Sequence, residues 1–447
     1  MSRASVQEVE LVEGDEPEAP RTPVVRWRRW WFVPVLVALL AVGVQTSLDA
    51  RARAQEARVA ALPGTLESVG AALDVLWTVA PQDVPVVKAD HEVNGALVGS
   101  RQADDGTYAA LALDAATGRT RWSVPLDVSH ARLNPRFGPG EPQCRPGGDL
   151  LYCMVDAPTG TDRAVLTIDA TDGSIVRRIE VPAADQFAVD GAWTYLVRQK
   201  PRTSCDVSGV DGATVRWTTS VPCETGSLLV VGAGLVAVGD AGSEITVLDR
   251  TGAVHEREHG AWAWALGDAI VVATSDDRGA ATSRLLRRGH PDIEVAGAVM
   301  VPRVDDGSAS DVVVTTDRDT QGFDARTGKH LWTAPVSLAG SPIVRGGQIV
   351  DSGAGDAVLA IDAHSGRVHH RLAMRPDQHS QDPLTDGRRF LGLVRDGPSL
   401  PVRVLAFDVA GGGPVDQLQL PPGVIGVQQS GRRLLGIEAS GTVRLLG

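Results

Sequence analysis

A pattern that returns along the chain constrains the fold more than any other feature of the sequence. The stretch LDAATGRTRW at residues 113–122 returns as FDARTGKHLW at residues 323–332. In both copies an Asp precedes a Gly by four positions, and a Trp follows four positions after that Gly. Weaker copies begin at positions 168, 361 and 407, where Trp is replaced by Arg177, His370 and Asp416. Such a repeat indicates either a recurring site or a recurring turn of a repeat fold.

Runs of Val, Leu, Ile and Ala alternate with turns rich in Gly and Asp from about residue 74 onward, and such runs predict β-strands. Examples lie at residues 234–240, 244–249, 269–275, 311–316, 357–362 and 403–408. Residues 341–374 form the fullest unit, in which the Asp turn joins the third and fourth of four strands. Four antiparallel strands in roughly 40 residues are typical of one blade of a β-propeller.

The repeated residues are predicted to be structural. The Asp can accept hydrogen bonds from backbone N–H groups of its own turn, and the Gly can adopt positive φ at little steric cost. Trp122, Trp217 and Trp332 would then pack between adjacent blades. The residues assigned to these turns are Asp114, Gly118, Trp122, Asp169, Gly173, Asp324, Gly328, Trp332, Asp362, Gly366, Asp408 and Gly412.

The two ends of the repeat region complement each other. Residues 432–447 provide a second and a third strand but no fourth, and residues 73–81 supply the missing strand, with Trp77 in the Trp position. Closing the ring in this way removes open sheet edges. We therefore expect an all-β fold, an eight-bladed β-propeller of four-stranded blades over residues 74–447. Counting every unit, including the degenerate ones at 185–222 and 261–295, gives nine blades, and this alternative stays open.

An apolar segment precedes the repeats. Residues 30–48 form a run of about 19 residues without Lys, Arg, Asp or Glu, enough to cross a hydrocarbon core of about 30 Å. We predict a transmembrane helix over 30–48, after a disordered acidic cytoplasmic tail over 1–29. A helical stalk is predicted over 49–73, interrupted at Pro63 and Gly64 and including a second short helix at 65–73.

The orientation of this segment follows from its flanking charges. Arg26, Arg28 and Arg29 precede it, and this bias favours a cytoplasmic amino end in the plasma membrane and an extracytoplasmic propeller. A cleaved signal peptide is the alternative, although no clear A-x-A cleavage site follows the run.

The cysteines point to the same compartment. Cys144, Cys153, Cys205 and Cys223 all follow the apolar segment, and an even number on one side fits disulfides in an oxidising environment. Three pairings are possible; we favour Cys144–Cys153 and Cys205–Cys223 because both are local. Four buried thiols are the alternative, and the lack of C-x2-C spacing disfavours zinc.

The copies LDAATGRTRW and FDARTGKHLW resemble the tryptophan-docking repeats of the quinoprotein alcohol dehydrogenase-like superfamily, the PQQ-type propellers, over residues 74–447. The superfamily includes PQQ-dependent dehydrogenases and cofactor-free binding propellers, so the resemblance implies the architecture without choosing between them. The dehydrogenases place PQQ against a disulfide of adjacent cysteines and hold calcium with Glu, Asn and Asp. This chain has no adjacent cysteines, and its asparagines are Asn94 and Asn134.

No other pattern carries recognisable chemistry. The histidines at 364, 369, 370 and 379 are interpreted as surface residues instead of metal ligands, because His369 and His370 would point to opposite faces of a strand and could not both join one metal site. Residues 104–106 and 305–307, both Asp-Asp-Gly, are interpreted as hairpin turns instead of calcium loops. Trp262 and Trp264 share a strand face, either between blades or at a ligand in the central channel.

These observations predict a protein without catalytic residues, bound cofactor or metal. The net charge of −12 argues against a nucleic-acid partner. We expect a non-catalytic extracytoplasmic propeller anchored in the membrane, a scaffold or receptor for an envelope protein or a cell-wall ligand. A PQQ-dependent quinoprotein dehydrogenase is the alternative.

Overall fold

The computed structural model describes most of the chain. The described residues are 32–89, 91–103, 105–128, 144–157, 163–200, 203–223, 228–240, 242–276, 279–353, 357–373, 379–395, 402–408 and 414–447. They divide into two units, which meet in the sequence between Gln55 and Glu56. The predicted tail over 1–29 and the first two residues of the predicted span lie outside the described residues.

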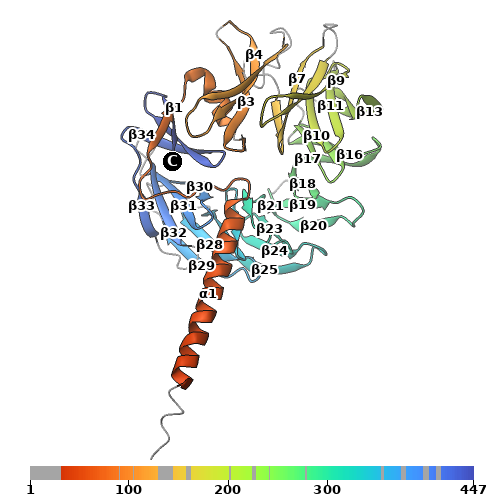
Figure 1. Cartoon of the computed structure of the whole chain (residues 1–447). Coiled ribbons are helices and arrows are strands. Elements are labelled where there is room, and N and C mark those ends of the chain that lie inside the picture. The colour runs from red at the N-terminus through yellow and green to blue at the C-terminus, as the bar shows by residue number, and fades with distance from the viewer. Residues whose placement is uncertain are drawn as a thin grey trace, which may run out of the picture. The chain divides into compact units, whose positions relative to one another are not determined.

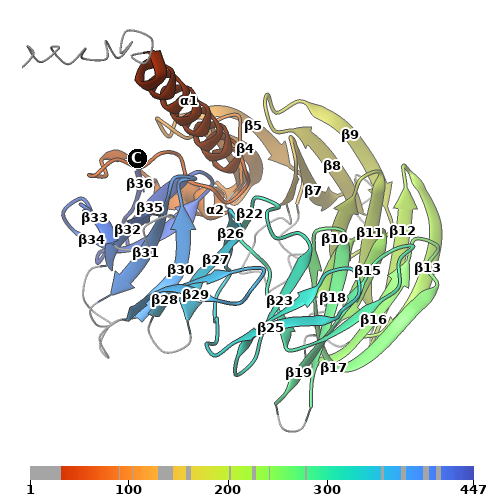
Figure 2. The ribbon, with the colours of Figure 1, turned by 90° about the horizontal axis from the view of Figure 1, so that it is seen from below.

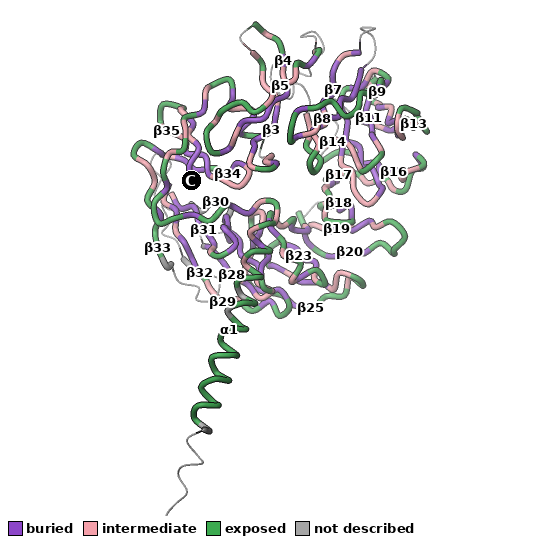
Figure 3. The backbone as a smooth tube through the Cα atoms, in the orientation of Figure 1, coloured by how far each residue is buried: buried purple, intermediate pink, exposed green. Residues whose placement is uncertain are grey.

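The first unit contains most of helix α1 (Phe32–Ala60). By length and composition its stretch Pro34–Ala60 could cross a membrane, a property that a signal sequence shares. Large apolar side chains such as Leu36 and Leu39 are exposed over half or more of their surface (Figure 3). A helix that is apolar all round and uncovered by protein suits an apolar surrounding better than water.

The segment that follows α1 differs from the predicted helical stalk. The helix ends at Ala60, just before Pro63 and Gly64, but the second helix expected over 65–73 is absent from the structure. Residues 61–73 form turns and extended chain instead. Leu66 and Leu73 are buried, and their backbone N–H groups donate to the carbonyls of Thr385 and Gln419. Packing against the propeller and these hydrogen bonds replace the helix that local composition favours.

The second unit is an all-β ring. Its blades follow one another around the ring in the order of the sequence (Figure 1 and Figure 2). Blade 1 consists of β2 (Glu92–Val93), β3 (Ala96–Gln102), β4 (Tyr108–Asp114) and β5 (Thr120–Leu126). Blade 2 consists of β6 (Cys144–Gly147), β7 (Leu150–Asp156), β8 (Arg163–Asp169) and β9 (Ile175–Val181). Blade 3 consists of β10 (Gln186–Asp190), β11 (Trp193–Lys200), β12 (Ser204–Asp211) and β13 (Thr214–Pro222).

The next three blades include the irregular part of the ring. Blade 4 consists of β14 (Leu228–Gly232), β15 (Leu235–Gly239), β16 (Ser243–Asp249) and the first half of β17 (Val254–Leu266). Blade 5 consists of the second half of β17 with β18 (Ala269–Ser275), β19 (Ala281–Leu286) and β20 (Ile293–Ala296). Blade 6 consists of β21 (Ala298–Val299), β23 (Val312–Thr316), β24 (Thr320–Asp324) and β25 (His330–Ala334).

The last three blades lead to the closure. Blade 7 consists of β26 (Ile343–Arg345), β27 (Gln348–Gly353), β28 (Ala357–Asp362) and β29 (Val368–Ala373). Blade 8 consists of β30 (His379–Thr385), β31 (Arg389–Arg395), β32 (Val402–Asp408) and β33 (Pro414–Leu418). Blade 9 consists of β34 (Val424–Ser430), β35 (Arg433–Glu438), β36 (Val443–Leu446) and, from the start of the domain, β1 (Val75–Thr78).

The pattern of strand pairing explains why the sequence allowed both eight and nine blades. The described strands form eight hydrogen-bonded sheets, one of which has seven strands. In that sheet β17 pairs with β16 through Val254 and with β18 through Trp264, so one continuous strand serves two blades. The expectation of eight therefore matches the sheets, and the alternative of nine matches the blades. Both degenerate units, 185–222 and 261–295, are complete blades.

The hydrophobic core is divided among the junctions between blades. The described residues contain nine buried apolar clusters, and each joins two successive blades. Ile245 and Ile270 meet between blades 4 and 5, and Leu97 and Leu445 meet between blades 1 and 9. Because β1 also pairs antiparallel with β36, both hydrogen bonds and apolar packing close the ring.

Two connections differ from simple hairpins. Between β1 and β2 the chain forms the short helices η2 (Pro81–Asp83) and α2 (Val84–Lys88), which sequence patterns did not indicate. After β21 the chain runs to β22 (Val304–Asp305), which pairs in parallel with β26 of blade 7. The prediction of a hairpin turn at residues 305–307 is therefore wrong. Of the other predicted turn, residues 105 and 106 do lie between β3 and β4, and residue 104 lies outside the described residues.

Candidate functional site

Four tryptophans make the same joint between successive blades. Each indole Nε1 donates a hydrogen bond to the backbone carbonyl that follows the motif Asp of the next blade, and each ring lies against the glycine of that turn. The hydrogen bonds run from Trp77 to Ala115 (3.1 Å), Trp122 to Ala170 (3.0 Å), Trp217 to Arg250 (2.6 Å) and Trp332 to Ala363 (2.8 Å). The glycines are Gly118, Gly173, Gly252 and Gly366.

The motif aspartates organise their own turns. The Asp324 carboxylate accepts hydrogen bonds from the backbone N–H of Thr327 at 2.7 Å and from its hydroxyl at 2.6 Å. Equivalent bonds hold the turns of Asp114 and Asp362, and Asp169 accepts one from the backbone N–H of Thr171. These carboxylates are therefore occupied as acceptors within turns.

The first of these turns also holds an ion pair. The Arg121 guanidinium and the Thr117 hydroxyl lower the pKa of Asp114 to about 2. Gly118, Gly328 and Gly366 adopt φ between +69° and +70°, the left-handed conformation that glycine tolerates. In the turn of blade 8, Gly412 lies outside the described residues, as does the side chain of Asp408.

Other side chains occupy the Trp position at several junctions, among them those that follow blades 2 and 5. Arg177 of blade 2 lies against Gly212 of blade 3, where an added Cβ would be 3.0 Å from its guanidinium. Ile293 of blade 5 lies against Gly328 of blade 6, where an added Cβ would be 2.6 Å from its Cγ2. The aliphatic side chain preserves an apolar joint, whereas the guanidinium makes a polar one.

A charged cluster stands at the junction of blades 4 and 5. Glu256 lies four positions after Gly252, the place that Trp takes in a full motif, and its side chain is only 8% exposed. It pairs with Arg284 of blade 5, which also contacts Glu258 at 3.1 Å and Asp292 at 3.8 Å. Burial, together with the neighbouring carboxyl of Glu258, raises the pKa of Glu256 to about 7 despite Arg284. We did not single out this residue from the sequence, although counting from Gly252 would have found it.

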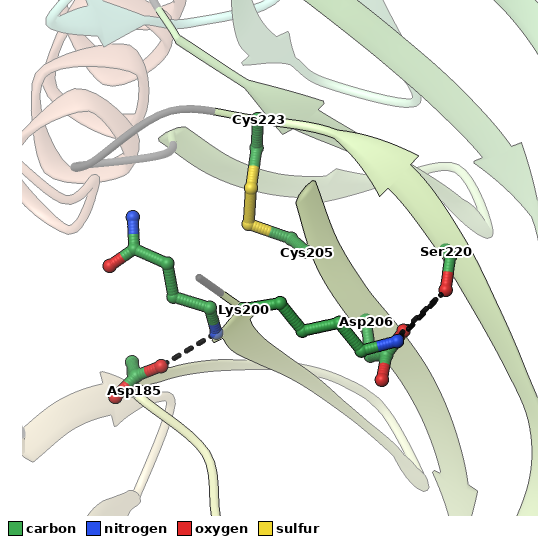
Figure 4. The surroundings of a disulfide bond; sticks show 7 residues. Asp185, Lys200, Cys205, Asp206, Ser220 and Cys223 are labelled. Carbon is green, nitrogen blue, oxygen red and sulfur yellow. Dashed lines mark hydrogen bonds and ion pairs between the residues drawn. A yellow bond between two sulfur atoms is a disulfide. The ribbon is translucent and has the colours of Figure 1, made fainter. Parts of the chain in front are cut away.

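Both disulfides that we favoured from the sequence are present. Cys144 and Cys153 are direct partners on β6 and β7, with Cα atoms 4.1 Å apart. Cys205 and Cys223, with Cα atoms 5.6 Å apart, tie the beginning of β12 to the chain just after β13 (Figure 4). They lie in blades 2 and 3, so each disulfide stabilises a single blade.

Polar groups surround the second disulfide. Lys200 lies 2.6 Å from Asp206, which also accepts a hydrogen bond from the Ser220 hydroxyl (Figure 4). Burial opposes ionisation of Asp206, but Lys200 and Ser220 outweigh it and lower the pKa. The arrangement is a local ion pair and shows no catalytic geometry.

The tryptophans at 262 and 264 have different surroundings. Trp264 packs against the cluster between blades 5 and 6, whereas Trp262 is 45% exposed. Of the histidines singled out earlier, His364 lies 3.2 Å from Asp311 and His369 lies 3.7 Å from Asp362, whereas the side chain of His379 lies outside the described residues. Across the described ranges, no group of three or more His, Cys, Asp or Glu residues is placed to hold a metal ion.

Two cavities could accept a ligand. One, of about 480 Å³, lies between blades 1 and 2 and is lined by residues that include Lys88, His91 and Cys144; burial lowers the pKa of His91. The other, of about 260 Å³, lies among blades 5, 6 and 7 and is lined by Arg287 and mostly apolar side chains. Sequence reasoning found neither cavity, because each depends on residues brought together from several blades.

A comparison with family models finds PQQ-type repeats in part of the chain. Residues 207–411 match the PQQ repeat family described as outer membrane protein assembly factor BamB. No curated protein matches the chain. BamB from Moraxella catarrhalis is 12% identical with a TM-score of 0.41, covering 84% of this chain and 99% of that one. The computationally designed Ika8 protein is 13% identical with a TM-score of 0.38, covering 68% and 94%. The C-terminal WD40 domain of Sif2 is 8% identical with a TM-score of 0.38, covering 86% and 99%.

Proposed function

Because this chain is a PQQ-like β-propeller protein, with residues 207–411 matching the BamB family, we propose that it is a non-catalytic binding protein of the cell envelope. The observation that carries the proposal is that the repeated residues serve the structure of the ring. The Asp, Gly and Trp of the motif are engaged in turns and blade joints, as at Asp324, Gly366 and Trp332. The ring is thus a rigid frame, and its non-repeated turns provide the surface for a partner.

Two features support a location outside the cytoplasm. The disulfides Cys144–Cys153 and Cys205–Cys223 are typical of an oxidising compartment. The apolar part of α1, with exposed side chains such as Leu39, suits an anchor in the plasma membrane. We propose a single-pass protein with a cytoplasmic amino end and an extracytoplasmic propeller.

The matched family supports the kind of partner. Its description names an outer membrane protein assembly factor. A scaffold or receptor acting on an envelope protein or a cell-wall ligand is the corresponding role for this chain. The turns of the ring, instead of a catalytic centre, would determine which partner binds.

Cross-linking in living cells, followed by mass spectrometry, tests this function. The control is an amino-terminal fragment that ends at Gln55. A longer fragment would expose Val59, Leu66 and Leu73, which are buried in the propeller unit of the full chain. We expect an envelope protein to be captured by the full chain and not by residues 1–55. Equal capture by both chains would contradict the scaffold role, as would turnover of an alcohol substrate by the purified protein with PQQ and calcium.

A further inference from the structure

The repeat departs most clearly from its pattern at the turn between β19 and β20. Where most other blades carry the Asp turn, blade 5 has the sequence Arg287-Arg288-Gly289-His290. This basic turn belongs to a chain whose net charge is −12. A turn that loses the structural Asp and gains two guanidinium groups has the charge to attract an anion.

A cavity of about 260 Å³, the blade-5 pocket, lies beside this turn. Blade 6 is irregular here, because its first strand β21 has only two residues, after which the chain leaves to pair as β22 with blade 7. The walls are largely aliphatic and include Leu266, Leu285 and Met300. The pocket is thus large and apolar enough to accept an aliphatic side chain.

Arg287 is the cationic group in the wall of the blade-5 pocket. Its Nε is buried without a hydrogen-bond partner, and its side chain makes no ion pair with another described residue. An unmatched buried donor is costly, and a guanidinium fork fits a carboxylate with two parallel hydrogen bonds. A carboxylate that entered the pocket would therefore find a donor whose hydrogen-bonding capacity is unused.

Hydrogen-bond acceptors are also present in the lining of the pocket. Asp268, Asp305 and Ser310 are exposed and line the pocket. The Asp305 carboxylate accepts a hydrogen bond from the backbone N–H of Gly307, and a carboxylate has further acceptor capacity. These acceptors disfavour a bare inorganic anion and suit a ligand that joins a carboxylate to an N–H donor and an aliphatic group.

We propose that the blade-5 pocket binds the carboxyl terminus of a peptide whose last side chain is aliphatic. The terminal carboxylate pairs with Arg287, the side chain enters the space lined by Leu285 and Met300, and the last amide N–H faces Asp305 or Ser310. The proposal rests on the proposed function, since it names the chemistry by which a partner is recognised.

The direct test uses the full-length protein in detergent micelles and two fluorescein-labelled peptides, Gly-Ser-Ala-Leu with a free carboxyl terminus and the same peptide as a carboxamide. Fluorescence anisotropy measures both affinities. We expect the free acid to bind with a Kd below about 1 mM and the amide to bind about 10- to 100-fold more weakly. Equal affinities, or no saturable binding of the acid up to about 5 mM, would overturn the proposal.

Variants locate the binding. Arg287→Gln should weaken binding of the acid about 10- to 100-fold, whereas Arg288→Gln, an exposed neighbour that does not line the pocket, should change it less than about twofold. Ser310→Trp keeps every charge and should abolish binding, because the indole would block the pocket. This variant therefore separates binding in the pocket from electrostatic attraction to the surface. Equal losses in both arginine variants, or unchanged binding in Ser310→Trp, would refute the pocket. The scaffold role is judged separately, since cross-linked capture can persist through any other surface.

Discussion

The indole Nε1 of Trp332 in blade 6 donates a hydrogen bond to the backbone carbonyl of Ala363 in blade 7, at 2.8 Å. Trp332 is only 6% exposed, and its ring lies against Gly366, where an added Cβ would be 2.5 Å away. The motif is continuous in sequence but works across two junctions. Its Gly receives the Trp of the preceding blade, and its own Trp reaches forward to the next.

Replacing Trp332 with Ala should lower the free energy of unfolding by about 3–5 kcal/mol, because a large buried side chain and its hydrogen bond are both lost. Trp262→Ala is the matched control, since that indole is 45% exposed and its loss should cost less than about 1 kcal/mol. Chemical denaturation of the two variants measures both effects. Equal losses of unfolding free energy in the two variants would mean that the contact of Trp332 with blade 7 does not stabilise the ring.

Gly366→Ala tests the other half of the same joint. The residue has φ +70°, and a new Cβ would collide with the Trp332 ring. Gly267 also has positive φ, +55°, but no atom lies within 4 Å of its added Cβ. Gly366→Ala should therefore destabilise the protein by about 1–3 kcal/mol more than Gly267→Ala. Similar melting temperatures for the two variants would show that backbone strain alone sets the cost.

The strands and the closure of the ring could be predicted because they depend on local patterns. All six strand examples, from 234–240 to 403–408, are strands in the structure. The blade number was harder, since blade 5 lacks the Asp turn and shares β17 with blade 4. Counting Asp turns along the sequence therefore misses blade 5.

The remaining errors concern contacts between distant segments. Local composition favours a helix after α1, but Leu66 and Val69 are recruited into the cluster between blades 8 and 9. The blade-5 pocket is lined by residues of three blades, which no periodicity brings together. The role of Glu256 depends on Arg284 in the next blade. In each case a tertiary contact decides what the local sequence leaves open.

The junction of blades 4 and 5 should make stability depend on pH. The pKa of Glu256 is about 7 in the folded chain and about 4.5 as a free side chain, so the folded state holds a proton that the unfolded state releases. This contribution is complete below pH 4.5 and is lost as pH rises through about 7. The size of the shift corresponds to about 3 kcal/mol over that interval.

Glu256→Gln should remove most of this dependence, because the amide is neutral throughout. Glu180→Gln, on the exposed outer strand of blade 2, is the control and should leave the slope unchanged. Urea denaturation at intervals from pH 4.5 to pH 8 compares the three proteins. If wild type and Glu256→Gln showed the same slope, the buried carboxyl would not be the titrating group.

The end of α1 and the chain between α1 and β1 should behave as part of the propeller. Val59, Leu66 and Leu73 are 0%, 1% and 3% exposed, and burying each such side chain contributes about 1.5–3 kcal/mol. A protein that begins at residue 56 should therefore melt like the full chain, whereas one that begins at residue 74 should lose several kcal/mol of its free energy of unfolding.

A point substitution tests the same segment. Leu66→Ala in the chain from residue 56 should lower the free energy of unfolding by about 2–5 kcal/mol. Leu76→Ala is the control, because that side chain is 36% exposed. A chain from residue 74 as stable as one from residue 56 would show that the segment is a dispensable linker.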